Sequence, residues 1–405
     1  MNWIYSAKPD TAEAEASTPP GTSAAALWLA RLTLSDFRCY AQISLEAEPW
    51  PLILTGPNGA GKTNLLEAVS FLSPGRGLRR ARLGEIDRLA PGETAAGRVW
   101  AVSARVMGPQ GPCDLGTGRD PAREMAGRDR RLVKVDGSFV RGQQALGEVF
   151  NVVWLTPQMD GLFRDAASGR RRFLDRLVYG FDPTHAGRVA AYEQVLRERA
   201  RLLRTGRGDA AWLTSLEESV ARYGVAVAAA RRDLMARLAG ACAAGVGPFP
   251  RAELGLVGEV ESWLGELSAL ESEDRLRERL EAGRAQDAEN GGATSGPHRS
   301  DLAVRHLETG LAAGLCSTGE QKALLISIVL AHARLLTLDR GAAPVLLLDE
   351  VVAHLDEQRR AALFEELLAL GAQAWMTGTD AALFDGLRGA AQFFLVRDAR
   401  VTRAA

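Results

Sequence analysis

The run GPNGAGKT at residues 56–63 is the feature that most constrains how this chain can fold. It matches the phosphate-binding pattern G-x-x-x-x-G-K-[ST] at every fixed position. The short apolar run 51–55 before it predicts a buried strand, and residues 64–72 after it carry apolar side chains at helical spacing. Strand, glycine loop and helix are the context that the pattern requires, and a chance glycine-rich turn would not explain both flanks. We therefore predict an α/β fold built around a phosphate site.

The residue types in this run fit a nucleoside triphosphate. Glycines let backbone N–H groups approach phosphate oxygens without a Cβ in the way, and the N-terminus of the following helix favours an anion. Lys62 can reach the β- and γ-phosphates, and the Thr63 hydroxyl can bind Mg²⁺. We therefore expect ATP and Mg²⁺ as cofactors. The residues expected to hold them here are Gly56, Asn58, Gly59, Gly61, Lys62, Thr63 and Asn64.

An acidic strand end lies far along the chain from this loop. The apolar run 345–348 ends at Asp349 and Glu350, which is the Walker B pattern. Asp349 can hold Mg²⁺ directly or through water, and Glu350 can polarise an attacking water. Such pairs often only cap the next turn. Combined with a phosphate loop, the pair indicates an ATPase in which Lys62 and Glu350 are catalytic.

Two further polar residues stand at the ends of predicted elements. Gln158 follows the apolar strand 152–156, where an amide can ligate Mg²⁺ or orient water, although a surface glutamine is the commoner case. Ser317 precedes the long apolar helix 323–336 and has capping-box spacing to Glu320. The serine is therefore expected to cap that helix. The helix start is either only well capped or a second phosphate site.

Composition limits the class of protein. A chain of 405 residues with 46% hydrophobic and 24% charged residues predicts a soluble protein of about two or three domains. Net charge is −1, so any nucleic-acid site must be a local patch. The four cysteines are far apart and predict neither a zinc site nor a disulfide framework. No apolar run of membrane-span length and no signal pattern is seen, which predicts a cytoplasmic protein without a membrane partner.

The chain divides by composition into four segments. Residues 1–26, rich in Ala, Ser, Thr, Pro and Glu, predict a disordered tail. Residues 27–180 and 296–405 are expected to form two parts of one head, and 181–295 an α-helical insertion of roughly two to four helices. Within the head, 132–140 reads as a hairpin with an Asp-Gly turn, and 108–130 as a mobile loop.

An arginine cluster lies just past the first helix. Arg76 is followed by Arg79, Arg80 and Arg82. The cluster is either a solvated basic loop or a contact to the DNA backbone. Arg79, Arg80 and Arg82 are our candidates for that contact. A second run, 170–172, lies on a predicted helix whose apolar residues pack inward, and a solvated helix face accounts for its arginines.

The order of these motifs resembles the heads of ABC-type ATPases, and further stretches resemble the RecF family of recombination mediators. The stretches are LSDFR at 34–38, GPNGAGKTNLLE at 56–67, RRFLD at 171–175, GPHR at 296–299 and residues 347–356. The resemblance implies an ATPase head with an α-helical insertion, and an ATP-dependent homodimer with slow, DNA-stimulated hydrolysis. It implies DNA binding near single-strand/duplex junctions, and work with the partners RecR and RecO at gaps and stalled forks to promote recombinase loading.

The same resemblance implies roles for individual residues. Ser317, with Gly319 beside it, would be the signature serine that contacts the γ-phosphate bound to the opposite protomer. Gln158 stands near the Q-loop position, and Asp356 matches the D-loop.

The chain also departs from the family pattern. Glu350 stands where the family often has a second aspartate, and residues 353–354 are Ala-His rather than Ser-Glu. Neither change removes a carboxylate that the Walker B chemistry needs. The transporter-type switch histidine is absent, and Thr377 or Thr379 stands near its place, which leaves that role open.

Three readings follow from these residues. The first is a DNA-repair ATPase, and the second is the nucleotide-binding subunit of an ABC transporter. The third is a structural clamp that binds ATP without needing turnover, which DNA retention with a non-hydrolysable nucleotide would distinguish. The missing switch histidine, the large insertion and the RecF-like stretches favour the repair ATPase over the transporter subunit.

Overall fold

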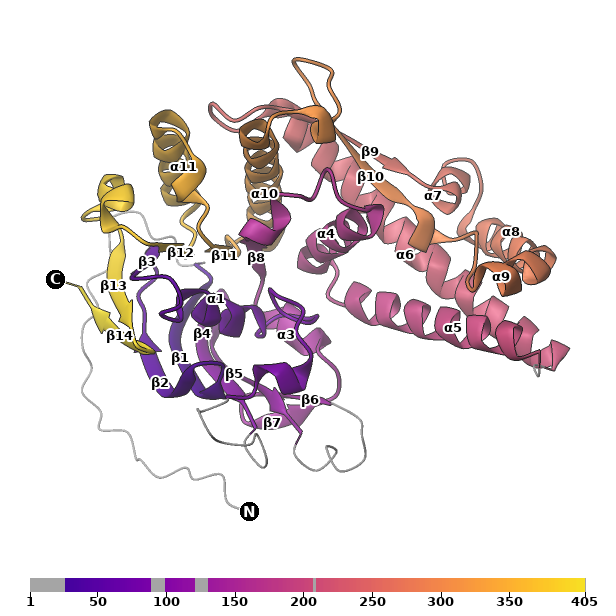
Figure 1. The fold of residues 1–405 in the computed structure, drawn as a ribbon, viewed down its shortest axis with the longest axis horizontal. Helices are drawn as coiled ribbons and strands as arrows, with labels where there is room; N and C mark the ends of the chain where they lie inside the picture. The colour runs from indigo at the N-terminus through magenta and orange to yellow at the C-terminus, as the bar shows by residue number, and fades with distance from the viewer. Residues whose placement is uncertain (1–25, 89–98, 121–129, 207–208, 405) are drawn as a thin grey trace.

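The computed structural model describes residues 26–88, 99–120, 130–206 and 209–404 (Figure 1). The tail expected at 1–26 therefore lies outside the described residues except for its last residue. The described chain forms a head with two six-stranded sheets, and an arm built from helices and a two-stranded sheet.

The central sheet of the head has the order β14-β13-β3-β12-β11-β8. Strands β13, β3, β12, β11 and β8 run parallel, and β14 pairs antiparallel at the edge. β3 and β11 are buried along their whole length, which is why they read as continuous apolar runs. The strands are β3 Leu52–Thr55, β8 Val152–Leu155, β11 Val345–Leu348, β12 Ala374–Gly378, β13 Gln392–Arg397 and β14 Arg400–Arg403.

The second sheet of the head is antiparallel, in the order β2-β1-β4-β5-β6-β7. The predicted hairpin is confirmed, because β6 pairs with β7 and both turn residues, Asp136 and Gly137, have positive φ. The strands are β1 Trp28–Phe37, β2 Tyr40–Glu46, β4 Ala101–Gly108, β5 Gly111–Arg119, β6 Arg131–Val135 and β7 Ser138–Val140.

The prediction of a loop over residues 108–130 is wrong for the first half of this range. Gly111–Arg119 is strand β5, and residues 121–129 lie outside the described part of the chain. This strand could not be recognised in the sequence because several of its residues are glycines, which have no side chains to show the alternation typical of a strand. One of them is required by packing: a Cβ on Gly118 would lie 2.9 Å from the backbone oxygen of Trp100.

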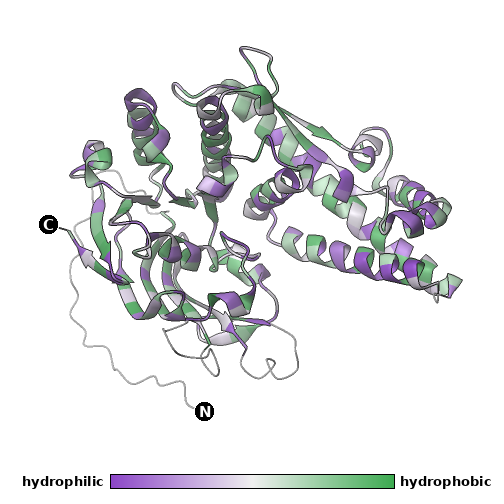
Figure 2. Cartoon of the chain, viewed as in Figure 1, coloured by the Kyte–Doolittle hydropathy of each residue, from purple (hydrophilic) through white to green (hydrophobic). Residues whose placement is uncertain are grey.

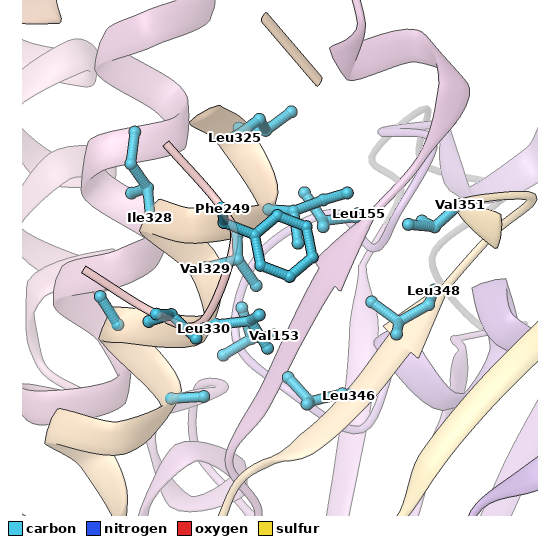
Figure 3. Packing of buried hydrophobic residues seen from close by; sticks show 14 of the residues in the cluster. Val153, Leu155, Phe249, Leu325, Ile328, Val329, Leu330, Leu346, Leu348 and Val351 are labelled. Carbon is cyan, nitrogen blue, oxygen red and sulfur yellow. The ribbon is translucent and has the colours of Figure 1, made fainter. Parts of the chain in front are cut away.

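Helices cover both faces of the central sheet. α10 packs on one face against Val153, Leu346 and Leu348, together with Phe249 from the arm (Figure 3). α1 lies on the other face, in a core shared by both six-stranded sheets. The helices of the head are α1 Lys62–Ser70, α3 Gln144–Val149, α4 Ala167–Phe181, α10 Thr318–Arg340 and α11 Glu357–Leu370. Its short 3-10 turns are η1 Leu83–Ile86, η2 Pro157–Met159, η3 Pro297–Arg299, η4 Ala313–Leu315, η5 Val352–His354 and η6 Ala381–Leu387.

The expectation that the chain has no apolar run of membrane-span length is wrong for α10. Among the described residues it is the one helix long and apolar enough to cross a membrane by length and composition. However, 78% of its most apolar window is buried in the core of the protein. That burial is typical of a core helix in a soluble fold rather than of a membrane span.

The arm extends away from the head and is mostly helical (Figure 1). α5 and α6 pack against each other as an antiparallel pair, and Figure 2 shows hydrophilic and hydrophobic residues alternating along α5. The arm also contains β9, which pairs with β10 and which we did not expect in this charged segment. The elements are α5 His185–Thr205, α6 Ala210–Ala244, β9 Ala252–Val257, α7 Glu259–Trp263, α8 Ala269–Ala282, α9 Arg284–Asn290 and β10 Asp301–His306.

A buried ionic cluster joins the arm to the head. Asp175 on α4 accepts two hydrogen bonds from Arg231 on α6, at 2.8 and 2.9 Å, and lies 2.9 Å from the ring of His185 on α5. Arg231 also donates to the backbone oxygen of Pro297. Burial alone would raise the pKa of Asp175, but Arg231 and His185 outweigh it and hold the pKa at about 2. Charged Asp175 therefore stabilises this joint above its unfolded pKa of about 3.9, and that contribution is lost as pH falls toward 2.

Replacing Asp175 with asparagine is expected to destabilise the protein by about 3–5 kcal/mol, because buried Arg231 would lose its hydrogen-bonded carboxylate and keep only Glu261, at 3.7 Å, as a counter-charge. The measurement is the shift of the urea unfolding midpoint at neutral pH. The matched control is Asp339→Asn, which removes a carboxylate from the exposed pair with Arg237 and is expected to cost about 0–1 kcal/mol. Equal shifts for the two variants would contradict the role of the buried cluster.

Candidate functional site

The sheet topology brings the predicted site residues to one edge of the central sheet. In the order β3-β12-β11-β8, the register pairs Thr55 with Gly378, and Leu348 with both Met376 and Leu155. The carboxyl ends of these parallel strands therefore lie side by side. The segments that follow them are the phosphate loop, the turn after β12, the Walker B pair and the turn containing Gln158. Ligands of open α/β sheets bind at this kind of edge.

The phosphate loop needs glycine at two positions for different reasons. Gly56 has φ of 143°, and a Cβ there would lie 2.1 Å from the backbone oxygen of Val396 on β13. Gly61 has φ of 113°, and a Cβ there would meet the Tyr40 hydroxyl at 2.6 Å. That hydroxyl donates to the Gly61 oxygen. Neighbouring chain segments therefore press on the loop from both sides and fix its shape.

Lys62 is the first residue of α1, and its side chain turns back over the loop. Its Nζ donates to the backbone oxygens of Gly56 at 2.7 Å and Pro57 at 2.9 Å. Burial lowers the pKa of Lys62, while the nearby charges of Glu350 and Asp349 act in the opposite direction. The ammonium group thus lies within the concavity of the loop, between backbone dipoles and the two Walker B carboxylates.

The Walker B aspartate is held between two hydroxyl groups. Thr63 Oγ1 donates to Asp349 Oδ1 at 2.9 Å, and Thr377 Oγ1 donates to the same oxygen at 2.8 Å. Burial raises the pKa of Asp349, and the two hydroxyl groups counter part of that rise. A carboxylate and a threonine hydroxyl in contact form an oxygen donor set that suits Mg²⁺.

Glu350 adopts a strained backbone conformation beside this pair. Its φ of 52° lies in the left-handed region, which non-glycine residues seldom adopt. Its N–H donates to Thr377 Oγ1 at 2.9 Å. Thr377 therefore bridges Asp349 and Glu350, whereas Thr379 is exposed. The sequence left both threonines open for the switch position, and the contacts favour Thr377.

Gln158 lies in the short turn η2 directly after β8 and is exposed. The turn is connected to the helix that Ser317 caps, because Asp160 Oδ2 lies 3.6 Å from Lys322 Nζ on α10. Burial lowers the pKa of Lys322, while Asp160 raises it. No local pattern singles out the pair of Lys322 and Asp160, since the contact joins distant segments.

The predicted capping box at Ser317 is confirmed. Ser317 Oγ accepts from the N–H of Glu320, and Glu320 Oε2 accepts from the N–H of Ser317 at 2.9 Å. Ser317 and Gly319 are exposed. Within the described residues, no hydrogen bond or ion pair connects Ser317 to the phosphate loop of its own chain. Asp356 is also exposed and caps α11 through the N–H of Arg359.

The arginines after α1 are not equivalent. Arg79 donates to Asn64 at 2.8 Å and to Glu67 at 3.2 Å, so it is held against α1. Arg38 binds the same Glu67 through two hydrogen bonds. Arg80 and Arg82 are exposed. The sequence missed Glu67, which is fully buried, because a glutamate on a helix normally faces solvent.

Comparisons with known proteins agree with this geometry. The family model described as "RecF/RecN/SMC N terminal domain" matches residues 28–397. The relative named DNA replication and repair protein RecF from Mesorhizobium japonicum is 48% identical over 370 residues, covering 91% of this chain and 96% of the relative. The protein of the same name from Rhizobium meliloti is 47% identical over 378 residues, covering 93% of this chain and 99% of the relative.

Two solved structures share the fold. A structure of the recombination mediator protein RecF with ATPγS in the RecFOR pathway matches with a TM-score of 0.81 and 22% identity, covering 94% of this chain and 99% of that one. The Smc head domain of Pyrococcus furiosus matches with a TM-score of 0.52 and 14% identity, covering 94% and 96%. At these identities the matches show the fold alone, and they confirm an ATPase head with a helical insertion.

Proposed function

Because the chain belongs to the RecF family of DNA replication and repair proteins, we propose that it is an ATP-dependent DNA-binding protein of recombinational repair. The observation that carries the proposal is the contact of Thr63 with Asp349 beside a complete phosphate loop. A hydroxyl and a carboxylate in contact beside the loop support a divalent-cation site next to the triphosphate. The family excludes the transporter subunit that the sequence left as an alternative.

Each residue at the sheet edge has a part in the proposed ATPase reaction. Gly56, Gly59, Gly61 and Lys62 hold the phosphates, and Asn58 and Asn64 complete the loop. Thr63 and Asp349 would hold Mg²⁺, and Gln158 would be a further ligand of the cation or orient a water beside it. When bound, Mg²⁺ neutralises charge on the β- and γ-phosphates. Glu350 accepts a hydrogen bond from the attacking water and orients it, while Thr377 fixes the backbone of Glu350.

The second half of each site comes from another copy of the chain in this proposal. Ser317 and Gly319 are exposed at a helix start and bind no group of their own phosphate loop, so they are available to the γ-phosphate of a partner protomer. Asp356 would lie at the same interface. In this proposal the protein is an ATP-dependent homodimer, and its hydrolysis of ATP is slow and stimulated by DNA.

The partners and the domain division are part of the proposal. The relative solved in the RecFOR pathway supports RecR and RecO as partners, and a cytoplasmic location follows from that role. DNA contacts at gaps and junctions are placed on the loop of Arg79, Arg80 and Arg82, with Arg79 acting from its position against Glu67. In this proposal residues 27–180 and 296–405 belong to the head and 181–295 to the insertion, although β10, which follows residue 296, pairs with β9 and lies in the arm.

The test measures ATP turnover by the full chain with gapped duplex DNA, with liposomes and with neither. We expect gapped DNA to raise the rate and liposomes to leave it unchanged. Omitting Mg²⁺ is expected to abolish turnover under every condition, because Thr63 and Asp349 would then lack the cation. An ATPase rate that responds to liposomes but not to DNA would overturn the proposed function.

A further inference from the structure

A cleft separates the head from the base of the arm. Its volume is about 730 Å³, within the range of ligand sites. One wall is the loop after α1, a second is the segment between β7 and α3, and a third consists of α4 and the start of α5. The residues after β8 close its inner end.

The cleft is lined by several arginines that form no ion pair among the described residues. Arg76, Arg80, Arg141 and Arg172 come from three different walls, and all four are exposed. Across the part of the chain that the structure describes, none of the four has a hydrogen bond or an ion pair. Burial lowers the pKa of Arg80, and so do the neighbouring charges of Arg172 and Arg76, while Glu193 acts in the opposite direction. The structure has thus brought together positive charges that repel one another.

The lining has fewer carboxylates, Asp165, Asp175 and Glu193, than guanidinium groups. Asp175 is already bound to Arg231 and His185 at the joint with the arm. Glu193 has its ion pair with Arg197, at 3.6 Å on the exposed side of α5. The cleft therefore presents an excess of guanidinium groups. Such an excess fits an anionic ligand, and the planar guanidinium fork matches a phosphate group.

The inner end of the cleft combines charge with an aromatic surface. Arg176 lies over the ring of Trp154 at 4.4 Å and near Phe173 at 5.4 Å. Its Nε has no hydrogen-bond partner. Burial lowers the pKa of Arg176 to about 9. An anion that entered the cleft would stabilise this guanidinium group, which has carbonyl and sulfur contacts but no carboxylate.

The walls are held in place by partly buried hydrogen bonds. The Arg131 guanidinium donates to the backbone oxygens of Phe71, Ser73 and Gly75. Gln143 Oε1 accepts from the N–H of Gly75 at 2.8 Å, which joins the first wall to the second. The loops that carry the arginines are therefore already ordered, so a ligand would not lose binding free energy by ordering them.

We propose that this cleft binds the sugar–phosphate backbone of a single DNA strand, an inference that rests on the proposed function. The volume is too small for a duplex but suits one or two nucleotides of a strand. Arginines on three walls match a chain of successive phosphates better than one terminal phosphate. Gln158 and Thr156 line the same cleft, so a bound strand would lie beside the residue placed near Mg²⁺.

The test uses the double variant Arg141→Ala/Arg172→Ala, which lies outside the loop 79–82 already proposed to contact DNA. Binding to a gapped duplex is measured by fluorescence anisotropy over a series of salt concentrations. We expect the slope of log K against log salt to flatten by about 1 for each arginine removed. The control is Arg397→Ala/Arg400→Ala on the β13–β14 hairpin, which removes the same charge and is expected to keep the slope.

The results separate the two hypotheses. If the unmutated protein binds no DNA, the proposed function and this inference both fail. If the double variant keeps the slope while Arg82→Ala, which lies outside the cleft, flattens it, DNA binding stands and the cleft is overturned. If thymidine monophosphate binds in an Arg172-dependent manner while the DNA slope is unchanged, the ligand is a free nucleotide and the proposal is again wrong. Arg172→Lys keeps the charge and is expected to retain the slope, which guards against misfolding.

Discussion

Replacing Glu350 with glutamine is expected to lower the rate of ATP turnover by about 10²–10⁴-fold while ATP binding is retained. Glutamine keeps the size of the side chain but cannot accept a proton from water. The bond from the backbone N–H of residue 350 to Thr377 does not involve the side chain, so the strained turn should persist. Single-turnover hydrolysis and nucleotide affinity are measured separately, which distinguishes loss of chemistry from loss of binding.

The same variant should accumulate as an ATP-bound dimer, because the step that releases the partner is blocked. Sizing with and without ATP tests this. Glu365→Gln on the exposed face of α11 is the matched control and should turn over ATP at the unmutated rate. Turnover of Glu350→Gln equal to that of the control would remove Glu350 from the mechanism.

The second large effect is expected from mixing two inactive variants, Lys62→Ala and Ser317→Arg. Lys62 lies within the phosphate loop, and Ser317 is exposed at the start of another helix without a contact to that loop among the described residues. If each nucleotide lies between Lys62 of one chain and Ser317 of its partner, each homodimer has a defect in both sites. A mixed dimer has both defects in one site and none in the other.

An equal mixture should therefore recover about a quarter of the unmutated ATPase rate, since half of the dimers are mixed and half of their sites are intact. The control mixes Lys62→Ala with Glu350→Gln. Both of these residues belong to one chain's half of the site, because Asp349 contacts Thr63 in the same chain. This second mixture should recover nothing. No recovery in the first mixture, when sizing shows ATP-dependent mixed dimers, would contradict independent shared sites.

The parts of the site that were predictable from sequence are those fixed by local geometry. The phosphate loop and the cap at Ser317 each depend on residues within a few positions of one another, so the spacing alone carries the information. The Asp136-Gly137 hairpin is of the same kind. The sequence also indicated that the carboxyl ends of the parallel strands lie near one another, since ligands bind at this edge of such sheets.

The parts that were missed depend on distant segments. Thr377 and Thr379 are equivalent in sequence, and only the position of β12 between β3 and β11 brings Thr377 to Asp349. Arg79 reads as a free arginine until Glu67 is seen to be buried. Strand β9 was hidden in a charged helical segment, because it is stabilised by pairing with β10 rather than by its own pattern.

The close approach of β13 to Gly56 has a consequence for the order in which the protein is made. The phosphate loop is shaped by Val396, and β3 is paired on both sides by strands that follow it late in the chain, β12 and β13. The Thr55 hydroxyl donates a hydrogen bond to the backbone oxygen of Phe394, which lies 339 residues later in the sequence. When the ribosome has just synthesised the GPNGAGKT run, the strands β12 and β13 that support this loop have not yet been made. We therefore expect a complete ATP site to form only after translation has passed β13, because the loop lacks the contact with Val396 until then.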